Sequence, residues 1–124
     1  STRPGHPLPH AWIEKGQNRD RTSTINLVKP GRFLLIAGEE GHDWCDAAKK
    51  ASETLGVPVD AVTIGHVKGD YLDPRLTWTK NREFGSRGAV LVRPDRFIAW
   101  RSMGSSPTAE SDLTAALAQV LHRA

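Results

Sequence analysis

The chain has 124 residues, which is enough for one domain whose hydrophobic core needs no disulfide or metal. Hydrophobic residues make up 38% and charged residues 25% of the chain, close to ordinary values for globular proteins. The formal charge is only +3 with arginines and acids interspersed, and the longest apolar run (33–37) is too short to span a bilayer, so we expect neither a nucleic-acid partner nor a membrane segment.

The first predicted segment is an N-terminal arm at residues 1–22. Its sequence is rich in proline, glycine and charge, a composition typical of a linker that leads into a domain. We therefore expect the domain to cover residues 23–124. We also expect the chain to be cut from something larger.

A strand, a strand, a helix and a strand are predicted next. Polar and apolar residues alternate over 23–28, which indicates a half-buried strand. The segment 32–37, which is continuously apolar after Arg32, indicates a central strand covered on both faces. Asp43 is a good N-cap and Gly56 a good C-terminal stop for the helix between them. Valine and isoleucine over 59–64 predict the following strand.

The second half predicts a short helix, a hairpin and a final helix. Asp73 and Pro74 indicate the start of a helix that runs to about Asn81. The apolar runs 89–92 and 97–100 flank an Arg-Pro-Asp-Arg turn and predict an antiparallel hairpin. Ser106 caps the final helix. The order β-β-α-β-α-β-β-α predicts an α/β, thioredoxin-like fold with a central mixed sheet and helices on both faces, with 23–28 as an extra strand.

The one motif that could carry chemistry is Trp44-Cys45-Asp46-Ala47-Ala48, at the predicted strand-to-helix junction. Thioredoxins place their Trp-Cys-x-x-Cys redox pair at this junction. Here the second cysteine position is Ala48, so no second thiolate can resolve a mixed disulfide. The helix N-terminus would lower the pKa of Cys45, but Asp43 and Asp46 would raise it.

A second feature of the thioredoxin site is also missing. Thioredoxins carry a cis proline just before the first hairpin strand, where this chain has Gly88 or Ala89. We therefore interpret Cys45 as a structural thiol in a reducing, cytoplasmic setting. The alternative is a single-cysteine redox protein that uses Cys45, although the residues before it offer no cation.

Other polar and aromatic residues carry weaker signals. Asp70 and Asp73 are best explained as cap and turn residues. The histidines have no metal-ligand spacing; they are His6, His10, His42, His66 and His122. The tryptophans are interpreted as core or interface anchors, with a stand-alone protein for small aromatic ligands as a third hypothesis; they are Trp12, Trp44, Trp78 and Trp100.

Three segments carry a family resemblance: RGAVLVRPDRFIAWRS (87–102), GRFLLIAGEEGHDWCDAA (31–48) and STRPGHPLPHAW (1–12). On them the chain resembles the C-terminal region of class A flavoprotein aromatic hydroxylases, nearest to the phenol and chlorophenol 2-monooxygenases. The resemblance implies a parent oxidoreductase in which NAD(P)H reduces FAD and a phenolic ring is hydroxylated. It also implies an accessory thioredoxin-like domain without the redox pair, which packs on the catalytic body and is often linked with dimerisation.

The resemblance assigns no catalytic, cofactor-binding or metal residue to these 124 positions. The dinucleotide fingerprint Gly-x-Gly-x-x-Gly and the second FAD motif of the family are absent from the sequence. FAD and NAD(P)H are therefore expected on the N-terminal domains of the parent, which would be the partners of this domain together with a possible second copy. Within the arm, contact with the catalytic body is expected from Arg3, His10 and Trp12.

Overall fold

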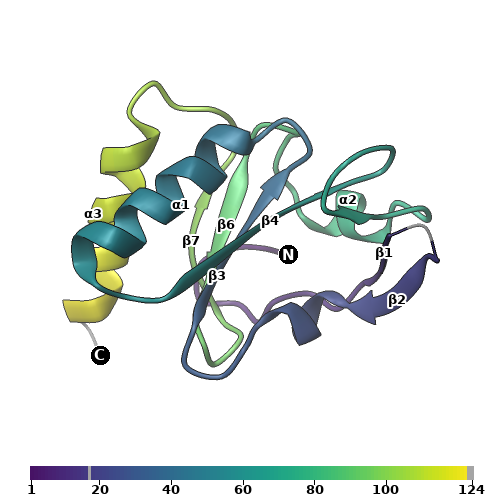
Figure 1. Cartoon of the computed structure of the whole chain (residues 1–124), viewed down its shortest axis with the longest axis horizontal. Coiled ribbons are helices and arrows are strands. Elements are labelled where there is room, and N and C mark those ends of the chain that lie inside the picture. The colour runs from purple at the N-terminus through teal and green to yellow at the C-terminus, as the bar shows by residue number, and fades with distance from the viewer. Residues whose placement is uncertain (17, 123–124) are drawn as a thin grey trace.

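A seven-stranded mixed sheet forms the centre of the computed structural model, which describes residues 1–16 and 18–122 (Figure 1). Residue 17 of the expected arm and residues 123–124 of the expected domain lie outside the described residues. The strand order is β2-β1-β5-β4-β3-β6-β7. In chain order the elements are β1 (Trp12–Lys15), β2 (Asp20–Ser23), the 3-10 helix η1 (Thr24–Leu27), β3 (Phe33–Gly38), α1 (His42–Leu55), β4 (Val59–Gly65), β5 (Tyr71–Leu72), α2 (Thr77–Asn81), β6 (Ala89–Val92), β7 (Ile98–Ser102) and α3 (Ala109–His122).

Strand β3 lies in the middle of the sheet, as its apolar sequence predicts. All six of its residues are buried, and it pairs in parallel with β4 and antiparallel with β6. Helix α1 follows after a short loop. It begins at His42 behind Gly41, which makes no side-chain cap, so the predicted cap at Asp43 is wrong and Asp43 lies in the first turn. Gly56 ends the helix in the left-handed conformation (φ 65°), as predicted.

Helices cover both faces of the sheet, which confirms the predicted fold class. Helices α1 and α3 pack side by side on one face (Figure 1). Beneath them lies a core that includes Leu35, Trp44 and Leu117. On the opposite face, Leu34 of β3 and Trp78 of α2 belong to a second core, which also includes residues of η1 and of the N-terminal segment. No helix in the described part of the chain is long and apolar enough to cross a membrane.

The strand predicted at 23–28 is wrong. Thr24–Leu27 is a 3-10 helix, and Ser23 Oγ accepts a hydrogen bond from the Ile25 N–H at its start. The Thr24 hydroxyl donates to the Pro9 carbonyl (2.7 Å) and accepts from the Ala11 N–H (3.1 Å). Such side-chain bonds compete with a strand ladder, and their partners are too distant in sequence for a periodic pattern to reveal them.

The described part of residues 1–22 belongs to the sheet and its core rather than to an arm outside them. Strands β1 and β2 form an antiparallel hairpin in which Trp12 lies opposite Ser23. Leu8, Ala11 and Ile13 are buried. A boundary at residue 23 would therefore cut the hairpin.

Of the remaining predicted elements, β6 has the predicted bounds and the others are present with shifted ends. Helix α2 begins at Thr77 rather than Pro74, and the two-residue strand β5 before it was not predicted. Strand β7 covers 98–102 rather than 97–100. Ser106 Oγ accepts a hydrogen bond from the Thr108 N–H just ahead of α3, in agreement with its predicted capping role.

Candidate functional site

The junction between β3 and α1 holds the only cysteine of the chain. Cys45 lies in the first turn of α1 and is half-buried, whereas Ala48 is fully buried in the core one turn later. Cys45 lines a shallow groove together with Lys49, Ser52 and β4 residues. The position of a second thioredoxin cysteine is thus a methyl group inside the core, and this site holds a single sulfur.

Burial, together with the negative charges of Asp70 and Asp46, raises the pKa of the Cys45 thiol to about 11. The predicted effect of Asp46 is therefore present. Asp70, brought close by the loop before β5, acts in place of the expected Asp43. Lys49 lies on the same groove, but it does not reverse the shift. Because the thiolate is the nucleophilic form, a raised pKa opposes thiol chemistry.

The chain's own backbone closes the place where a redox site would meet its substrate. The Gly38 N–H donates to the Gly88 carbonyl and the Glu40 N–H to the Ser86 carbonyl, both at 2.9 Å. A Cβ at Gly38 would lie 2.3 Å from the Ser86 oxygen. The loop before β6 therefore packs directly on the junction.

Trp44 holds this closed arrangement together. Its indole Nε1 donates to the carbonyls of Arg87 (3.0 Å) and Gly104 (3.1 Å), and its ring packs edge-on against Trp100 at 5.1 Å between centroids. A Cβ at Gly88 would lie 2.6 Å from the Ser102 carbonyl oxygen. That close approach leaves no room for a side chain at Gly88, and the described peptide bonds include no cis form.

The same junction does not fit a dinucleotide. Pyrophosphates bind where glycine N–H groups and a helix N-terminus point at the anion without competing charge. Here Glu39 and Glu40 occupy the loop after β3, and Asp43 lies in the first turn of α1. These carboxylates would repel a pyrophosphate, so the residues present do not suit FAD at this position.

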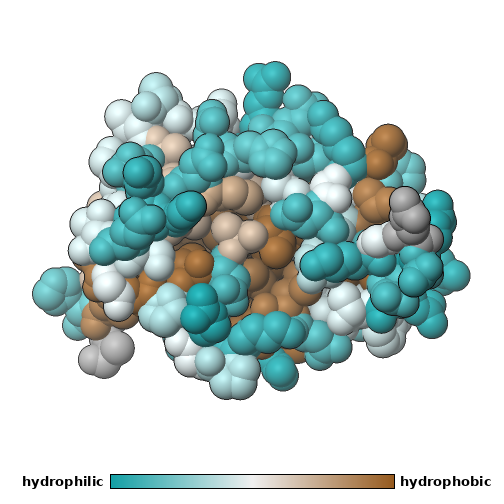
Figure 2. Space-filling view, in the orientation of Figure 1, coloured by the Kyte–Doolittle hydropathy of each residue, from teal (hydrophilic) through white to brown (hydrophobic). Residues whose placement is uncertain are grey.

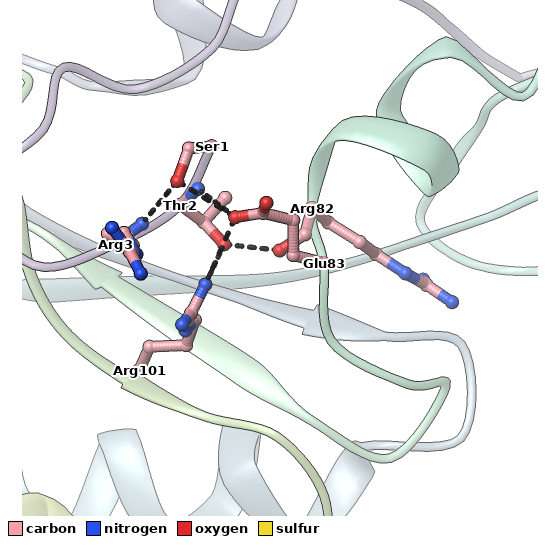
Figure 3. Close-up of polar contacts among 6 residues, drawn as sticks. All are labelled: Ser1, Thr2, Arg3, Arg82, Glu83 and Arg101. Carbon is pink, nitrogen blue, oxygen red and sulfur yellow. Dashed lines mark hydrogen bonds and ion pairs between the residues drawn. The ribbon is translucent and has the colours of Figure 1, made fainter.

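A polar network holds the N-terminus against β7 and the segment that follows α2 (Figure 3). The Thr2 side chain is fully buried, and its hydroxyl donates to the Arg82 carbonyl and accepts from Arg101 (3.2 Å). Glu83 accepts from the Ser1 hydroxyl (2.8 Å), from the Thr2 N–H (3.1 Å) and from Arg101 (3.2 Å). Sequence reasoning missed this network because its members lie about 80 residues or more from Thr2 and no local pattern joins them.

Residues 5–8 then run beside β7. The Gly5 N–H donates to the Ile98 carbonyl, the Ile98 N–H to the His6 carbonyl, and the Leu8 N–H to the Arg96 carbonyl, each at 2.8 Å. Pro7 forms an antiparallel bridge with Phe97. The N-terminal segment therefore covers the start of this edge of the sheet, which would otherwise be open to another chain.

The structure separates the three arm residues expected to meet the catalytic body. Arg3, His10 and Trp12 are all exposed. His10 and Trp12 pack edge to face at 4.9 Å, and the Arg21 guanidinium lies 5.2 Å from the Trp12 ring. Arg3 lies instead beside the network near β7, and four strands separate β7 from β1 in the sheet.

The tryptophans do not gather around a common cavity. Trp44 and Trp78 are buried in the two cores on opposite faces of the sheet. A groove of about 660 Å³ beside the β6–β7 turn contains no tryptophan. Its walls are mainly apolar, with the ion pair of Arg93 and Asp95 at one side. This arrangement does not support the hypothesis of an aromatic-binding protein built on tryptophans.

Asp70 and Asp73 both have structural partners, but Asp73 is not the predicted N-cap of α2, which is Leu76. The Asp70 carboxylate accepts from the Thr63 N–H at 2.9 Å, and the Asp73 carboxylate accepts from the Thr79 N–H (2.7 Å) and hydroxyl (2.8 Å). Among residues 1–16 and 18–122, no group of three or more histidine, cysteine or acidic side chains is placed to hold a metal ion.

Comparison with known proteins relates the whole chain to one group of enzymes. A family model described as the C-terminal part of aromatic-ring hydroxylases matches residues 1–124. The 2,4-dichlorophenol 6-monooxygenase of Delftia acidovorans is 41% identical over 98% of this chain. The chain spans 20% of that enzyme's length.

Two solved structures describe the fold. The flavin-dependent monooxygenase PieE, crystallised with FAD and substrate, superposes with a TM-score of 0.87 and 43% identity; the match covers all of this chain and 21% of PieE. A putative thiol:disulfide interchange protein DsbE from Chlorobium tepidum superposes over 98% of this chain and 99% of its own, with a TM-score of 0.64 and 13% identity. The second likeness concerns the fold alone and confirms the thioredoxin-like architecture.

Proposed function

Since this chain belongs to the family of aromatic-ring hydroxylase C-terminal domains, we propose that it is an accessory domain of a flavin-dependent aromatic-ring monooxygenase and catalyses no reaction by itself. The parent enzyme would hydroxylate a phenol-type ring. Its FAD and NAD(P)H sites would lie on the N-terminal domains, because the chain spans about a fifth of the curated relatives it matches. The lone thiol suits the reducing cytoplasm.

The observation that carries this proposal is the closure of the β3–α1 junction by the chain's own backbone. The loop before β6 is bonded to Gly38 and Glu40, and Trp44 clamps it in place. That loop occupies the side of the junction from which a thioredoxin substrate would approach, and Cys45 is half-buried along the β4 groove instead. The raised pKa of the Cys45 thiol adds a chemical reason to the steric one.

We propose that the domain acts by docking on its own N-terminal domains. Exposed tryptophan and arginine side chains are the residue types that most often carry protein–protein binding energy. Trp12, flanked by His10 and Arg21, supplies such a group on the β1–β2 hairpin. Arg3 lies near the N-terminus, where the preceding domains would join. We further propose that the domain pairs with a second copy of itself.

Two assays on the 124-residue chain test the absence of chemistry. Titration with FAD should leave the flavin fluorescence unchanged, and an insulin-reduction assay with dithiothreitol should proceed at the rate without protein. Saturable FAD binding, or a rate of insulin reduction that rises with protein concentration and disappears in Cys45→Ala, would refute the accessory role.

A further inference from the structure

The outer edge of β4 is open over a short stretch. Strand β5 pairs with β4 only at Ile64 and Gly65. The Phe33 N–H donates to the Pro58 carbonyl (3.0 Å), so by the alternation of a parallel ladder the even-numbered residues of β4 bond to β3. Val59 and Ala61 therefore turn their N–H and C=O groups away from the sheet. Among the described residues no strand pairs with these four groups.

The chain itself closes both ends of this open stretch. On one side the Thr63 N–H is donated to the Asp70 carboxylate at 2.9 Å. On the other side the Val57 N–H donates to the Ser52 carbonyl (3.2 Å), and the Val57 carbonyl accepts from the Ser52 hydroxyl (2.6 Å). An added strand could thus bond only to Val59 and Ala61.

A groove of about 440 Å³ runs between this edge and α1. Its helix side is formed by Cys45, Lys49, Ser52 and Glu53, whose spacing places them along one side of α1. β4 crosses the front of the view in Figure 1, and Figure 2 shows hydrophobic surface across the middle of this face, framed by hydrophilic residues. Pairing here would remove apolar surface from water as well as complete the backbone bonds.

We propose that two copies of this chain pair antiparallel along their β4 edges, with Asp60 at the two-fold axis. This inference rests on the self-association proposed above and names its surface. Val59 of one copy would lie opposite Ala61 of the second copy, each N–H donating to the other's carbonyl. The two-fold axis generates a second, identical residue pair. The four hydrogen bonds of the two pairs would use all of the open N–H and C=O groups of Val59 and Ala61 in both copies.

The charges on α1 select this register. Helix α1 runs antiparallel to β4, and two strand residues advance about 6.6 Å, close to the ~6 Å of four helix residues. Glu53 therefore lies alongside Val59, and Lys49 alongside Ala61, in the same groove. The proposed two-fold places Lys49 of each copy opposite Glu53 of the other. A two-fold centred on Ala61 would instead oppose lysine to lysine and would need the Thr63 N–H, which Asp70 already holds.

Asp60 is the costly position of this pairing, because its carboxylate would approach that of the second copy. Each Asp60 is already held by Arg32, whose Nε lies 3.1 Å from both carboxylate oxygens and whose Nη2 lies 3.0 Å from Oδ1. The four charged groups at the axis would sum to zero. The pairing therefore needs no further counterion.

Sedimentation velocity of the 124-residue chain from about 10 μM to about 1 mM tests the pairing. We expect a reversible dimer. Ala61→Pro should weaken it at least about tenfold, because it removes two of the four hydrogen bonds. Proline is tolerated on an edge strand whose N–H faces outward, so the far-UV circular dichroism should stay unchanged. A monomer at every concentration, or a dimer that a folded Ala61→Pro variant leaves intact, would overturn the proposal.

Charge variants decide the question even if Ala61→Pro does not fold. Lys49→Glu and Glu53→Lys should each weaken the dimer, and the double variant should restore it. Lys50→Glu is the matched control, since Lys50 is exposed on α1 but does not line the groove. Equal weakening in the single and double variants would overturn the register. The chain could instead be monomeric, with its β4 edge protected from hydrogen exchange only in the longer protein. That result would overturn the pairing of two copies and identify the N-terminal domains as the partner at this edge. The proposed accessory role would then still hold.

Discussion

At the scale of single residues, the side of the junction that faces the loop before β6 is filled by the chain's own atoms. Trp44 belongs to the motif that in thioredoxins precedes the reactive cysteine, but here its indole N–H clamps the loop before β6. Gly38 and Gly88 are required because neighbouring backbone oxygens occupy the space of a side chain. The residues beside Cys45 thus serve packing, and the thiol is half-buried at the border of the core.

Cys45 should react slowly with alkylating reagents. At pH 8 a thiol of pKa about 11 is roughly a hundredfold less ionised than one at the ordinary 9.0, so iodoacetamide should modify the folded chain roughly a hundredfold more slowly than the urea-unfolded chain. The same shift lowers the free energy of unfolding as the pH rises above 9.0, because the unfolded thiol loses its proton first. Equal modification rates in the two states would contradict this account.

Closure of the junction predicts a large cost for a methyl group at Gly38. In Gly38→Ala the new Cβ would lie 2.3 Å from the Ser86 carbonyl oxygen, and the loop before β6 would have to move. We expect a loss of about 1–3 kcal/mol or more in the free energy of unfolding, measured by urea denaturation. Gly104→Ala is the control, because nothing lies within 4 Å of its Cβ position, and it should change stability by less than about 0.5 kcal/mol. Similar losses in both variants would refute the closure.

At the scale of elements, local patterns predicted the centre of the fold and missed its margins. The apolar run of β3 and the helical spacing of α1 are signals within one segment, and both elements are present. The hairpin β1–β2 and the 3-10 helix η1 depend instead on side-chain bonds such as that from Thr24 to Pro9. Strand β5 has only two residues and no period to detect.

The candidate site divides in the same way. The absence of a second cysteine could be predicted from the sequence, because the fixed spacing of the thioredoxin motif identifies Ala48 as the position concerned. The contact of the loop before β6 with the β3–α1 junction and the open edge of β4 could not be predicted, since each depends on how strands distant in sequence pair. The contribution of Asp70 to the Cys45 pKa was missed for the same reason.

The N-terminal network should respond to acid. Hydrogen bonds from Ser1 and Thr2, together with the charge of Arg101, hold the pKa of Glu83 below its ordinary value of 4.5. A lowered carboxyl pKa stabilises the fold above 4.5, and that contribution is lost as the pH falls through the folded value. The thermal midpoints of the unaltered chain and of Glu83→Gln should differ at neutral pH and converge once the pH falls below the folded pKa of Glu83. A difference that stays constant with pH would exclude the network as its source.

At the scale of the whole molecule, the chain has a thioredoxin-like fold, and we propose that it acts as a docking unit. Its N-terminal segment covers the start of the β7 edge, and the exposed Trp12 lies on the hairpin at the opposite side of the sheet. The loop before β6, the hydrogen bonds of Trp44 and the polar network at the N-terminus all favour one closed arrangement over the open one that a redox cycle needs. Rigidity of this kind suits a domain that positions its neighbours.

Docking on the N-terminal domains predicts a distinct effect of Trp12 in the longer protein. Trp12→Ala removes an exposed side chain, so the isolated 124-residue chain should lose less than about 0.5 kcal/mol of stability. In the longer protein the same change should lower the thermal midpoint and loosen FAD retention, and Arg3→Ala with His10→Ala should act in the same direction. Val67→Ala, at another exposed apolar residue, is the control. Unchanged FAD retention and turnover in all these variants would remove the docking assignment.

Steady-state hydroxylation by the longer protein carrying Cys45→Ala tests the absence of chemistry in this domain most directly. The account predicts kcat and KM within about twofold of the unaltered enzyme, because a twofold change corresponds to only ~0.4 kcal/mol and no reacting group is removed. A fall in kcat of tenfold or more, with FAD still bound and the protein folded, would mean that the thiol takes part in the reaction.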